Sequence, residues 1–170
     1  IPLNKPFITA LRRVDSVESI ILTIKTDNGL TGYGSSAETK VITGDTKESI
    51  IRSIQIIMEE LKGEDLLAYN RVFEIINQSL IGNTSGKAAV DMAIYDVLAK
   101  ASKMPLYRYL GGSKRALESD MTISMGDPEL MVKDSLEAFE NGFKSLKIKL
   151  GSSPNTDYVR MANIFKRKLH

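Results

Sequence analysis

Two apolar runs separated by a turn signal lie near the start of the chain. Ser19 to Thr26 and Leu30 to Ser35 are rich in β-branched and apolar side chains and flank Asp27-Asn28-Gly29. Because Asn-Gly accepts positive φ angles, this pattern predicts an antiparallel hairpin. We expect a strand that includes Ile1 to Leu3 to join the hairpin. The segment from Lys5 to Arg13 has no clean period and is predicted to be a loop.

Three helical patterns follow the hairpin. Apolar residues at helical spacing predict a first helix that begins at a capping-box sequence, Asp45 to Glu48, and ends at Gly63. A second helix is predicted from about Asp65 to Leu80. A third, rich in small residues, is predicted from about Ser85 to Ser102, and a proline shortly afterwards ends it.

The last third of the chain alternates between strand and helix patterns. Strands are predicted at Asp120 to Met125 and Phe143 to Leu150, and helices at Pro128 to Asn141 and Asn155 to Leu169. This order favours parallel strands joined by right-handed crossovers, as in an α/β barrel or a doubly wound sheet. Two such units cannot close a (β/α)₈ barrel, which takes about 250 residues.

The change of pattern near Gly112 predicts two domains. We expect residues 1–112 to form an N-terminal α+β unit, and residues 113–170 to form the first β/α units of an incomplete barrel. The open strand edges of such a layer are a liability without a partner.

Composition limits the chemistry of the chain. Its 170 residues are 42% hydrophobic and 26% charged, with a net charge of +2, which is typical of a soluble globular protein and favours neither a nucleic acid nor a membrane as partner. There is no cysteine, so disulfides and thiolate metal sites are excluded. The only histidine is the terminal His170, so catalytic triads and histidine metal clusters are not expected. No signal peptide is apparent, and we expect a cytoplasmic location.

The last predicted strand carries the candidate chemistry. Lys147 and Lys149 lie two residues apart, so they share one face of the strand, whereas Leu146, Ile148 and Leu150 share the other. Two ammonium groups therefore point into the same space. From this stretch alone, a half-exposed strand with its lysines in water is the simpler interpretation.

A set of short sequence motifs favours a functional role for the lysine pair over a solvated strand face. They are Lys5-Pro-Phe, Ala10-Leu-Arg12, Gly32-Tyr-Gly34, Val41-Ile-Thr-Gly-Asp45, Lys87-Ala-Ala-Val-Asp-Met-Ala-Ile-Tyr-Asp96, Pro105-Leu106, Leu110-Gly-Gly112, Thr122-Ile-Ser124 and Lys147-Ile-Lys149. In this order and spacing, the set resembles the enolase superfamily, specifically its muconate-lactonizing branch and, within it, the dipeptide epimerases that act on Ala-Glu. The resemblance covers essentially the whole chain.

The resemblance implies an N-terminal α+β capping domain over a modified TIM-type barrel. It implies that Lys149 is a general base near the end of the second barrel strand, and that Lys147 is its electrostatic neighbour. It also implies that Arg12 pairs with a substrate carboxylate, and that Ile42 and Thr43 belong to a specificity loop.

Plainer alternatives exist for several of these residues. Arg12 and Arg13 could be solvated loop residues. Thr122 shares a strand face with Ser124 and is a candidate for lining the pocket, but plain packing is an equal alternative. The segment Lys166-Arg-Lys168 is most simply an exposed, basic helix face.

The chemistry of the lysine pair is intelligible from the residues. Epimerisation removes a proton α to a carboxylate and leaves an enediolate, so the site needs a base beside the carbon and positive charge at the oxygens. A free lysine is mostly protonated at neutral pH and is a poor base. A second ammonium on the same face disfavours the charged form, which makes Lys149 a better base.

The resemblance also implies a Mg²⁺ cofactor. In the superfamily, the acidic metal ligands and a second catalytic lysine lie on later barrel strands, which are expected in a missing C-terminal half. None of Asp120, Asp127, Asp134 and Asp157 matches those positions, so no metal ligand is assigned in this chain. A further departure is Ser35, which stands where the family often has a glutamate.

We therefore predict the N-terminal half of a Mg²⁺-dependent dipeptide epimerase, an isomerase. It would act on a small-molecule dipeptide and form a homo-oligomer, and the 170-residue piece alone is expected to be inactive. A muconate cycloisomerase or an N-acylamino-acid racemase of the same superfamily is the alternative. An alternative of another class is a truncated, non-catalytic oligomerising or binding fragment. The length of the native polypeptide would separate these hypotheses.

Overall fold

A computed structural model describes residues 1–166. The end of the last predicted helix at Leu169, two residues of the segment Lys166-Arg-Lys168, and His170 lie outside the described residues. The chain forms two compact units, one of residues 18–114 and one of residues 1–17 together with 115–170, and each is described by itself. No helix in the described part of the chain is long and apolar enough to cross a membrane.

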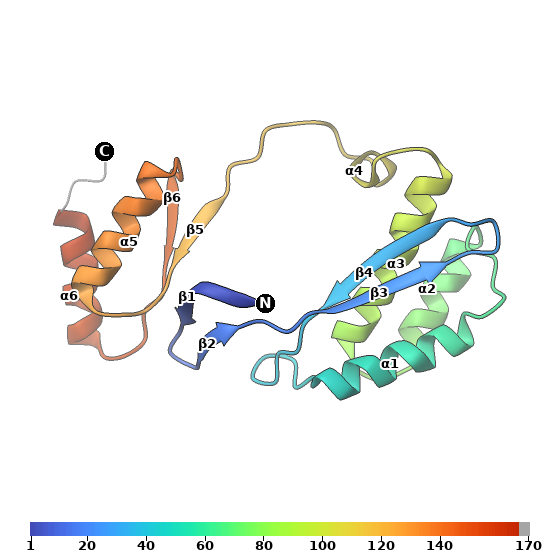
Figure 1. The fold of residues 1–170 in the computed structure, drawn as a ribbon, viewed down its shortest axis with the longest axis horizontal. Helices are drawn as coiled ribbons and strands as arrows, with labels where there is room; N and C mark the ends of the chain where they lie inside the picture. Colours follow the sequence, from blue (N-terminus) through green and yellow to red (C-terminus); the bar gives the residue numbers. More distant parts are fainter. Residues whose placement is uncertain (167–170) are drawn as a thin grey trace. The chain divides into compact units, whose positions relative to one another are not determined.

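The unit of residues 18–114 is a β-hairpin packed on helices. Strands β3 (Ile20–Lys25) and β4 (Thr31–Ser36) pair antiparallel, which confirms the hairpin pattern. Gly29 in the turn has a φ of +85°, a conformation that favours glycine. Figure 1 shows this hairpin running along the longest helix. The helices are α1 (Lys47–Glu60), α2 (Tyr69–Gln78), α3 (Thr84–Ala101) and the short α4 (Leu106–Tyr109).

The hydrophobic core of this unit lies where α1, α2 and α3 meet the inner face of the hairpin. Its fully or nearly fully buried side chains come from all three helices at the predicted helical spacing: Ile50, Ile54, Ile57, Val72, Ile75, Ile76, Ala89, Val90, Ala93 and Ile94. Burial of such side chains stabilises the fold by about 25 cal/mol per Å² of apolar surface.

The hairpin approaches α3 so closely that two positions admit no side chain. A Cβ atom at Gly34 would lie 1.8 Å from the carbonyl oxygen of Ala89, and one at Gly32 would lie 2.2 Å from that of Ala93. The small residues on this face of α3 allow the approach. The Gly-x-Gly string is therefore a packing requirement of the unit.

The starts of α1 and α2 differ from the prediction. Thr46, not Asp45, is the N-cap of α1: its side chain accepts the Ser49 N–H at 3.2 Å, and the Ser49 hydroxyl accepts the Thr46 N–H at 2.9 Å. The capping box was misplaced because serine, and not the expected acidic residue, closes it. Helix α2 begins at Tyr69 because the residues from Asp65 onward form a turn, closed by the bond from the Ala68 N–H to the Asp65 carbonyl (3.0 Å).

The other unit contains two small sheets. Strands β1 (Pro2–Ile8) and β2 (Arg13–Ser16) form an antiparallel pair. Strands β5 (Asp120–Ile123) and β6 (Ser145–Ile148) form a parallel pair. Helices α5 (Pro128–Glu140) and α6 (Pro154–Lys166) lie side by side against this pair (Figure 1). The strand–helix alternation predicted for the last third of the chain is thereby confirmed.

The N-terminal strand corrects two sequence predictions. The segment from Lys5 to Arg13 is not a loop, because β1 extends to Ile8 and β2 begins at Arg13. Residues 1–3 do not join the β3–β4 hairpin, since β1 pairs with β2. The register of that pair shifts between Pro2 and Phe7, which removes the period-2 alternation by which strands are recognised.

The compact units differ from the predicted domains in one respect. Residues 1–17 belong to one compact unit with the described residues from 115 onward. Hydrogen bonds explain this grouping: the Ile8 carbonyl accepts the Met125 N–H at 3.0 Å, and the Ile8 N–H donates to the Ser124 hydroxyl at 3.3 Å. A domain boundary near Gly112 stays a prediction.

Candidate active site

The two lysines lie at the carboxyl end of β6. In the parallel register Lys147 stands opposite Thr122, and the Lys149 N–H donates to the Ile123 carbonyl at 3.0 Å, just past the end of the strand. Ile148 points the other way, toward the core formed with α5 and α6. Lys149 is half-buried and Lys147 is exposed. The ends of parallel strands are where α/β enzymes place reactive side chains.

Thr122 and Ser124 share the lysine face of the sheet but have different partners. The Ser124 hydroxyl lies 3.3 Å from the Pro6 carbonyl and 3.3 Å from the Ile8 N–H, so it attaches β1 to the end of β5. Thr122 is half-buried, and its hydroxyl has no hydrogen-bond partner among residues 1–166. Of the two hydroxyls, that of Thr122 is therefore the one available to a ligand.

Arg12 lies in the turn between β1 and β2. The Thr9 hydroxyl closes this turn by accepting the Arg12 N–H at 3.3 Å, and the Thr9 N–H donates to the Arg12 carbonyl at 2.9 Å. The Arg12 side chain lines a cavity of about 570 Å³ together with Thr122 and Ser124. The structure thus brings Arg12 and Thr122 to one cavity, although they are 110 positions apart in the sequence.

The two adjacent arginines have different surroundings. Arg13 pairs with Asp15 at 2.8 Å, and its hydrogen bonds hold the pKa of that carboxyl below its usual value. Arg12 is half-buried and forms no ion pair within the described residues. A guanidinium without a protein carboxylate is suited to bind a carboxylate of a ligand.

The acidic side chains of the cavity are occupied by Lys5. Its ammonium lies 2.8 Å from Asp134 and 2.7 Å from Glu137 of α5. These hydrogen bonds raise the pKa of Lys5 and lower that of Glu137. Because both carboxylates face this ammonium, the α5 wall of the cavity offers no free acidic group to a ligand.

Ile42 and Thr43 lie in a tight turn of the other unit. Their N–H groups donate to the Thr39 carbonyl at 2.8 and 3.0 Å, and the Thr39 and Thr43 hydroxyls are 2.9 Å apart. Asp45 ends the turn, is buried, and accepts a hydrogen bond from the Ser85 hydroxyl at 2.5 Å. The Ile42 side chain is 71% exposed, so the turn presents an apolar group to solvent.

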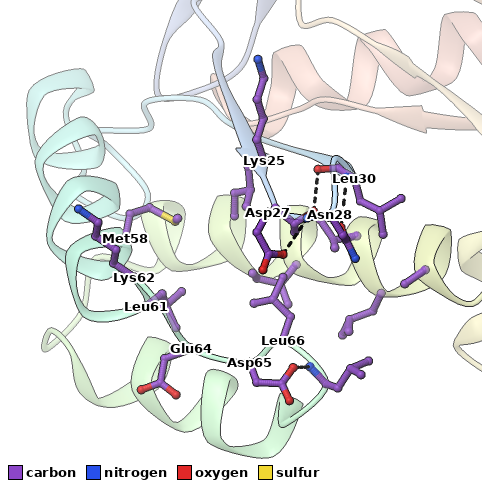
Figure 2. A pocket seen from close by; sticks show the side chains of 18 residues that line it. Lys25, Asp27, Asn28, Leu30, Met58, Leu61, Lys62, Glu64, Asp65 and Leu66 are labelled. Atoms are coloured by element: carbon purple, nitrogen blue, oxygen red, sulfur yellow. Dashed lines mark hydrogen bonds between the residues drawn. The ribbon is translucent and has the colours of Figure 1, made fainter.

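A larger cavity, of about 650 Å³, lies in the unit of residues 18–114. Figure 2 shows Met58, Leu61 and Leu66 in this pocket, with charged side chains of both signs, among them Lys62 and Asp65, around them. It shares no lining residue with the cavity of Arg12.

The described residues do not fit a metal centre. Within residues 1–166, no group of three or more His, Asp or Glu side chains lies together in a way that could hold an ion. Asp127 caps α5 through the Glu129 N–H at 2.9 Å, and Asp134 pairs with Lys5. Asp157 pairs with Arg160 at 2.7 Å. Magnesium takes oxygen ligands in octahedral geometry, and this part of the chain does not provide that set.

Sequence reasoning missed the Asp157–Arg160 pair. Arg160 is buried in α6, and its guanidinium reaches the Gly126 carbonyl at 2.8 Å. The only signal in the sequence is an acidic and a basic residue three positions apart at the start of a helix, a pattern that surface helices share.

Comparison with known proteins identifies the family. The pattern of "Mandelate racemase / muconate lactonizing enzyme, N-terminal domain" matches residues 1–111. The chain belongs to this family.

Two relatives within the mandelate racemase/muconate lactonizing enzyme family are L-Ala-D/L-Glu epimerases. That of Clostridium acetobutylicum is 44% identical over 167 residues, a match that covers 98% of this chain and 47% of the relative. That of Bacillus subtilis is 43% identical over 169 residues, a match that covers 98% of this chain and 46% of the relative. The chain spans about half the length of the curated relatives it matches.

Solved structures of family members have the same fold. One is a substrate-liganded complex of the Bacillus subtilis L-Ala-D/L-Glu epimerase, with a TM-score of 0.95 at 43% identity. The match covers 98% of this chain and 47% of the epimerase chain. Another is a dipeptide epimerase from Cytophaga hutchinsonii, complexed with Mg and D-Ala-L-Val, with a TM-score of 0.92 at 29% identity. The match covers 98% of this chain and 45% of that epimerase chain.

Most of the strings that indicated the family have structural roles in this chain. Asp96 accepts the Tyr33 N–H at 2.9 Å and the Lys100 ammonium at 2.6 Å, which binds α3 to β4. Burial alone would raise the pKa of Asp96, but these hydrogen bonds hold it below its usual value. Lys87 donates to the Asn77 carbonyl (2.7 Å) and the Leu80 carbonyl at the end of α2.

Proposed function

We propose that this chain is the N-terminal part of a dipeptide epimerase that removes the proton α to a carboxylate and forms an enediolate, with Ala-Glu as the substrate type. The observation that carries the proposal is the pair of lysines on one face at the carboxyl end of a parallel strand. Its support is the 43–44% identity to two L-Ala-D/L-Glu epimerases.

Lys149 acts as the base. In its neutral form the Nζ atom takes the α-proton, and the electron pair of the broken C–H bond passes into the enediolate. Lys149 suits this role because it follows directly after β6, at the carboxyl end of a parallel strand, and its N–H donates to the Ile123 carbonyl at 3.0 Å, which fixes its backbone. The proton returns from the opposite side, from a group outside the described residues, and gives the epimer.

Lys147 supplies positive charge beside the base. It stands opposite Thr122 in the register and is more exposed than Lys149. Its ammonium attracts the negative charge that develops on the carboxylate oxygens.

Arg12 binds the distal carboxylate of the dipeptide. Arg12 lines the cavity shared with Thr122, and its side chain has no carboxylate partner within residues 1–166. Thr122 donates or accepts a hydrogen bond in the same cavity. Ile42 and Thr43 contribute to specificity through the exposed turn that begins at Thr39.

The proposal extends to the fold and the cofactor. Residues 1–112 would cap a (β/α) barrel that begins at residue 113, because the β5–β6 pair has no further strand partner among the described residues. Related dipeptide epimerases have been solved with Mg. Magnesium would stabilise negative charge on substrate oxygens, with ligands from residues other than those described. The protein would assemble as a homo-oligomer.

The alternative within the family is racemisation of an N-acylated amino acid. A relative from Bacillus cereus, an N-succinyl-L-Arg/Lys racemase, is 27% identical over 170 residues. The higher identity to the Ala-Glu epimerases favours the dipeptide, so L-Ala-L-Glu and N-succinyl-L-Arg are the two substrates to compare.

The experiment follows α-proton exchange by NMR in D₂O with the full-length protein and Mg²⁺. We expect L-Ala-L-Glu to exchange and epimerise, and Lys149→Ala to lower the rate by about a thousandfold, within the range of 10²–10⁴ typical of a general base. Lys144→Ala is the matched control, because this lysine is exposed and pairs with Glu118. Exchange by Lys149→Ala at the rate of the control would refute the assignment.

A further inference from the structure

One side chain of α6 connects the loops that follow β5 and β6. The Arg160 residue is 8% exposed. Its Nε donates to the Gly126 carbonyl at 2.8 Å, and its Nη1 donates to Asp157 Oδ1 at 2.7 Å and to the Ser152 hydroxyl at 2.5 Å. Burying a guanidinium is costly, so this many directed partners indicate a position that is fixed.

Asp157 completes the connection. Its Oδ2 accepts the Gly151 N–H at 2.8 Å, and its Oδ1 lies 3.3 Å from the Ser152 hydroxyl. Burial alone would raise the pKa of Asp157, but the hydrogen bonds from Arg160, Gly151 and Ser152 hold it below its usual value. The carboxylate is therefore charged at neutral pH and holds both the guanidinium and the loop.

The loop held by this pair begins immediately after the lysines. Gly151 is two residues beyond Lys149 and has a φ of +126°, which favours glycine. A Cβ atom there would lie 2.8 Å from the Cβ of Ala10, a residue of the turn that carries Arg12. The end of β6, the end of β5 and the Arg12 turn thus meet around two residues of α6.

We propose that Asp157 and Arg160 are positioning residues, which set the separation between the ends of β5 and β6 and thereby place Lys149 against the α-carbon of the substrate. The kinetic test of this positioning role rests on the proposed function. Neither side chain touches the reacting atoms. They act through the backbone of Gly126 and Gly151, each two residues from a residue on the lysine face.

Conservative substitutions separate position from charge. Arg160→Lys keeps the positive charge, but a single ammonium cannot reproduce the planar fork that reaches Gly126, Ser152 and Asp157. Asp157→Asn keeps the shape and loses the charge. Because a displacement of about 1 Å costs about a hundredfold in rate, we expect each variant to lower kcat by about ten- to a hundredfold while KM changes less than threefold.

Face-specific exchange distinguishes positioning from general destabilisation. Lys149→Ala first defines the substrate epimer whose α-proton Lys149 removes. We then expect Arg160→Lys and Asp157→Asn to slow exchange from that epimer at least fivefold more than exchange from the other. Loss of folded protein would slow both equally. In the double variant the loss should not exceed that of the worse single variant, because the two residues act as one unit.

The matched control is another arginine paired with an acidic residue three positions away. Arg71 and Glu74 on α2 are 3.8 Å apart and exposed, so Arg71→Lys should leave both exchange rates within twofold. If Arg160→Lys does not fold, the ratio of the two exchange rates in Asp157→Asn tests the positioning role by itself. An unchanged ratio of the two exchange rates in the folded variants would overturn the positioning role. Failure of Lys149→Ala to affect either epimer would instead refute the proposed function.

Discussion

Two lysines on the same strand face have unequal surroundings. Lys149 is half-buried and its backbone joins the ladder to β5, whereas the Lys147 side chain is exposed. A charge acts over a distance, whereas a base must lie within hydrogen-bond reach of the proton that it removes. The difference in burial therefore agrees with a division of roles between the two lysines.

Lys147→Ala should lower kcat by about a hundredfold and change KM little. Loss of its ammonium removes positive charge beside the carboxylate oxygens, on which negative charge develops in the transition state. The measurement is kcat and KM of the full-length protein with L-Ala-L-Glu. A kcat equal to that of the unmodified protein would mean that Lys147 does not stabilise the transition state.

Arg12→Ala should mainly raise KM. A remote carboxylate keeps its charge during the reaction, so its partner binds substrate and transition state almost equally. Loss of a charge-assisted hydrogen bond of about 1.5–3 kcal/mol corresponds to an increase in KM of about 10- to 100-fold. Arg13→Ala is the control, because Arg13 already pairs with Asp15. Equal KM values for the two variants would contradict the role of Arg12.

At the scale of elements, the contact between the hairpin and α3 is the least adaptable part of the unit of residues 18–114. The atoms that exclude a side chain at Gly34 are backbone atoms of α3, which cannot rotate away as a flexible side chain could. Strand β4 and the helix must therefore separate if Gly34 is replaced.

Gly34→Ala should destabilise this unit by more than the about 1–3 kcal/mol that overpacking usually costs. The measurement is the midpoint of thermal or urea unfolding. Ser35→Ala is the neighbouring control, since Ser35 is exposed on the outer face of the hairpin and should shift the midpoint little. An alanine at position 34 that leaves the midpoint unchanged would show that the contact with α3 is looser than described.

The elements that sequence patterns predicted well are those whose signals are local. The β3–β4 turn, the apolar period of α1, the small residues of α3 and the proline at the start of α5 need only neighbouring residues. Only the start of β1 was predicted, and with the wrong partner, because its pairing has an irregular register and its partners come from β2 and from the end of β5. The start of α2 was misplaced because a turn at Asp65 has the same composition as a first helical turn.

At the scale of the whole molecule, the candidate site combines distant parts of the chain. The lysine pair was predictable because both residues lie in one strand segment and form the Lys-x-Lys motif by which the family was recognised. The cavity shared by Arg12 and Thr122, and the link from Arg160 to Gly126, depend on contacts between segments far apart in sequence. No periodicity or motif encodes such distances.

The 170-residue chain alone should not bind Mg²⁺ stoichiometrically. Among the described residues, no group of three or more acidic side chains lies together in a way that could hold an ion. Asp127 is a helix cap, and Asp134 and Asp157 are in ion pairs with Lys5 and Arg160. Isothermal titration calorimetry of this chain, with the full-length protein as the positive control, measures the difference. A stoichiometric Mg²⁺ site in the chain alone would require ligands that the described residues do not bring together.

The ammonium of Lys87 at the end of α2 has a consequence for the order of folding. Helix α2 has 10 residues, no side-chain bond at its N-cap and no basic residue in its own last turn. Ser79 bonds the Ile75 and Ile76 carbonyls, whereas the Asn77 and Leu80 carbonyls accept the ammonium of Lys87 from α3. Isolated helices shorter than about 12–15 residues are marginal in water, so α2 should become ordered only after α3 has formed. Lys87→Met should therefore accelerate amide hydrogen exchange in α2 while α1 and α3 stay protected; equal acceleration in all three helices would mean that they form as one cooperative unit.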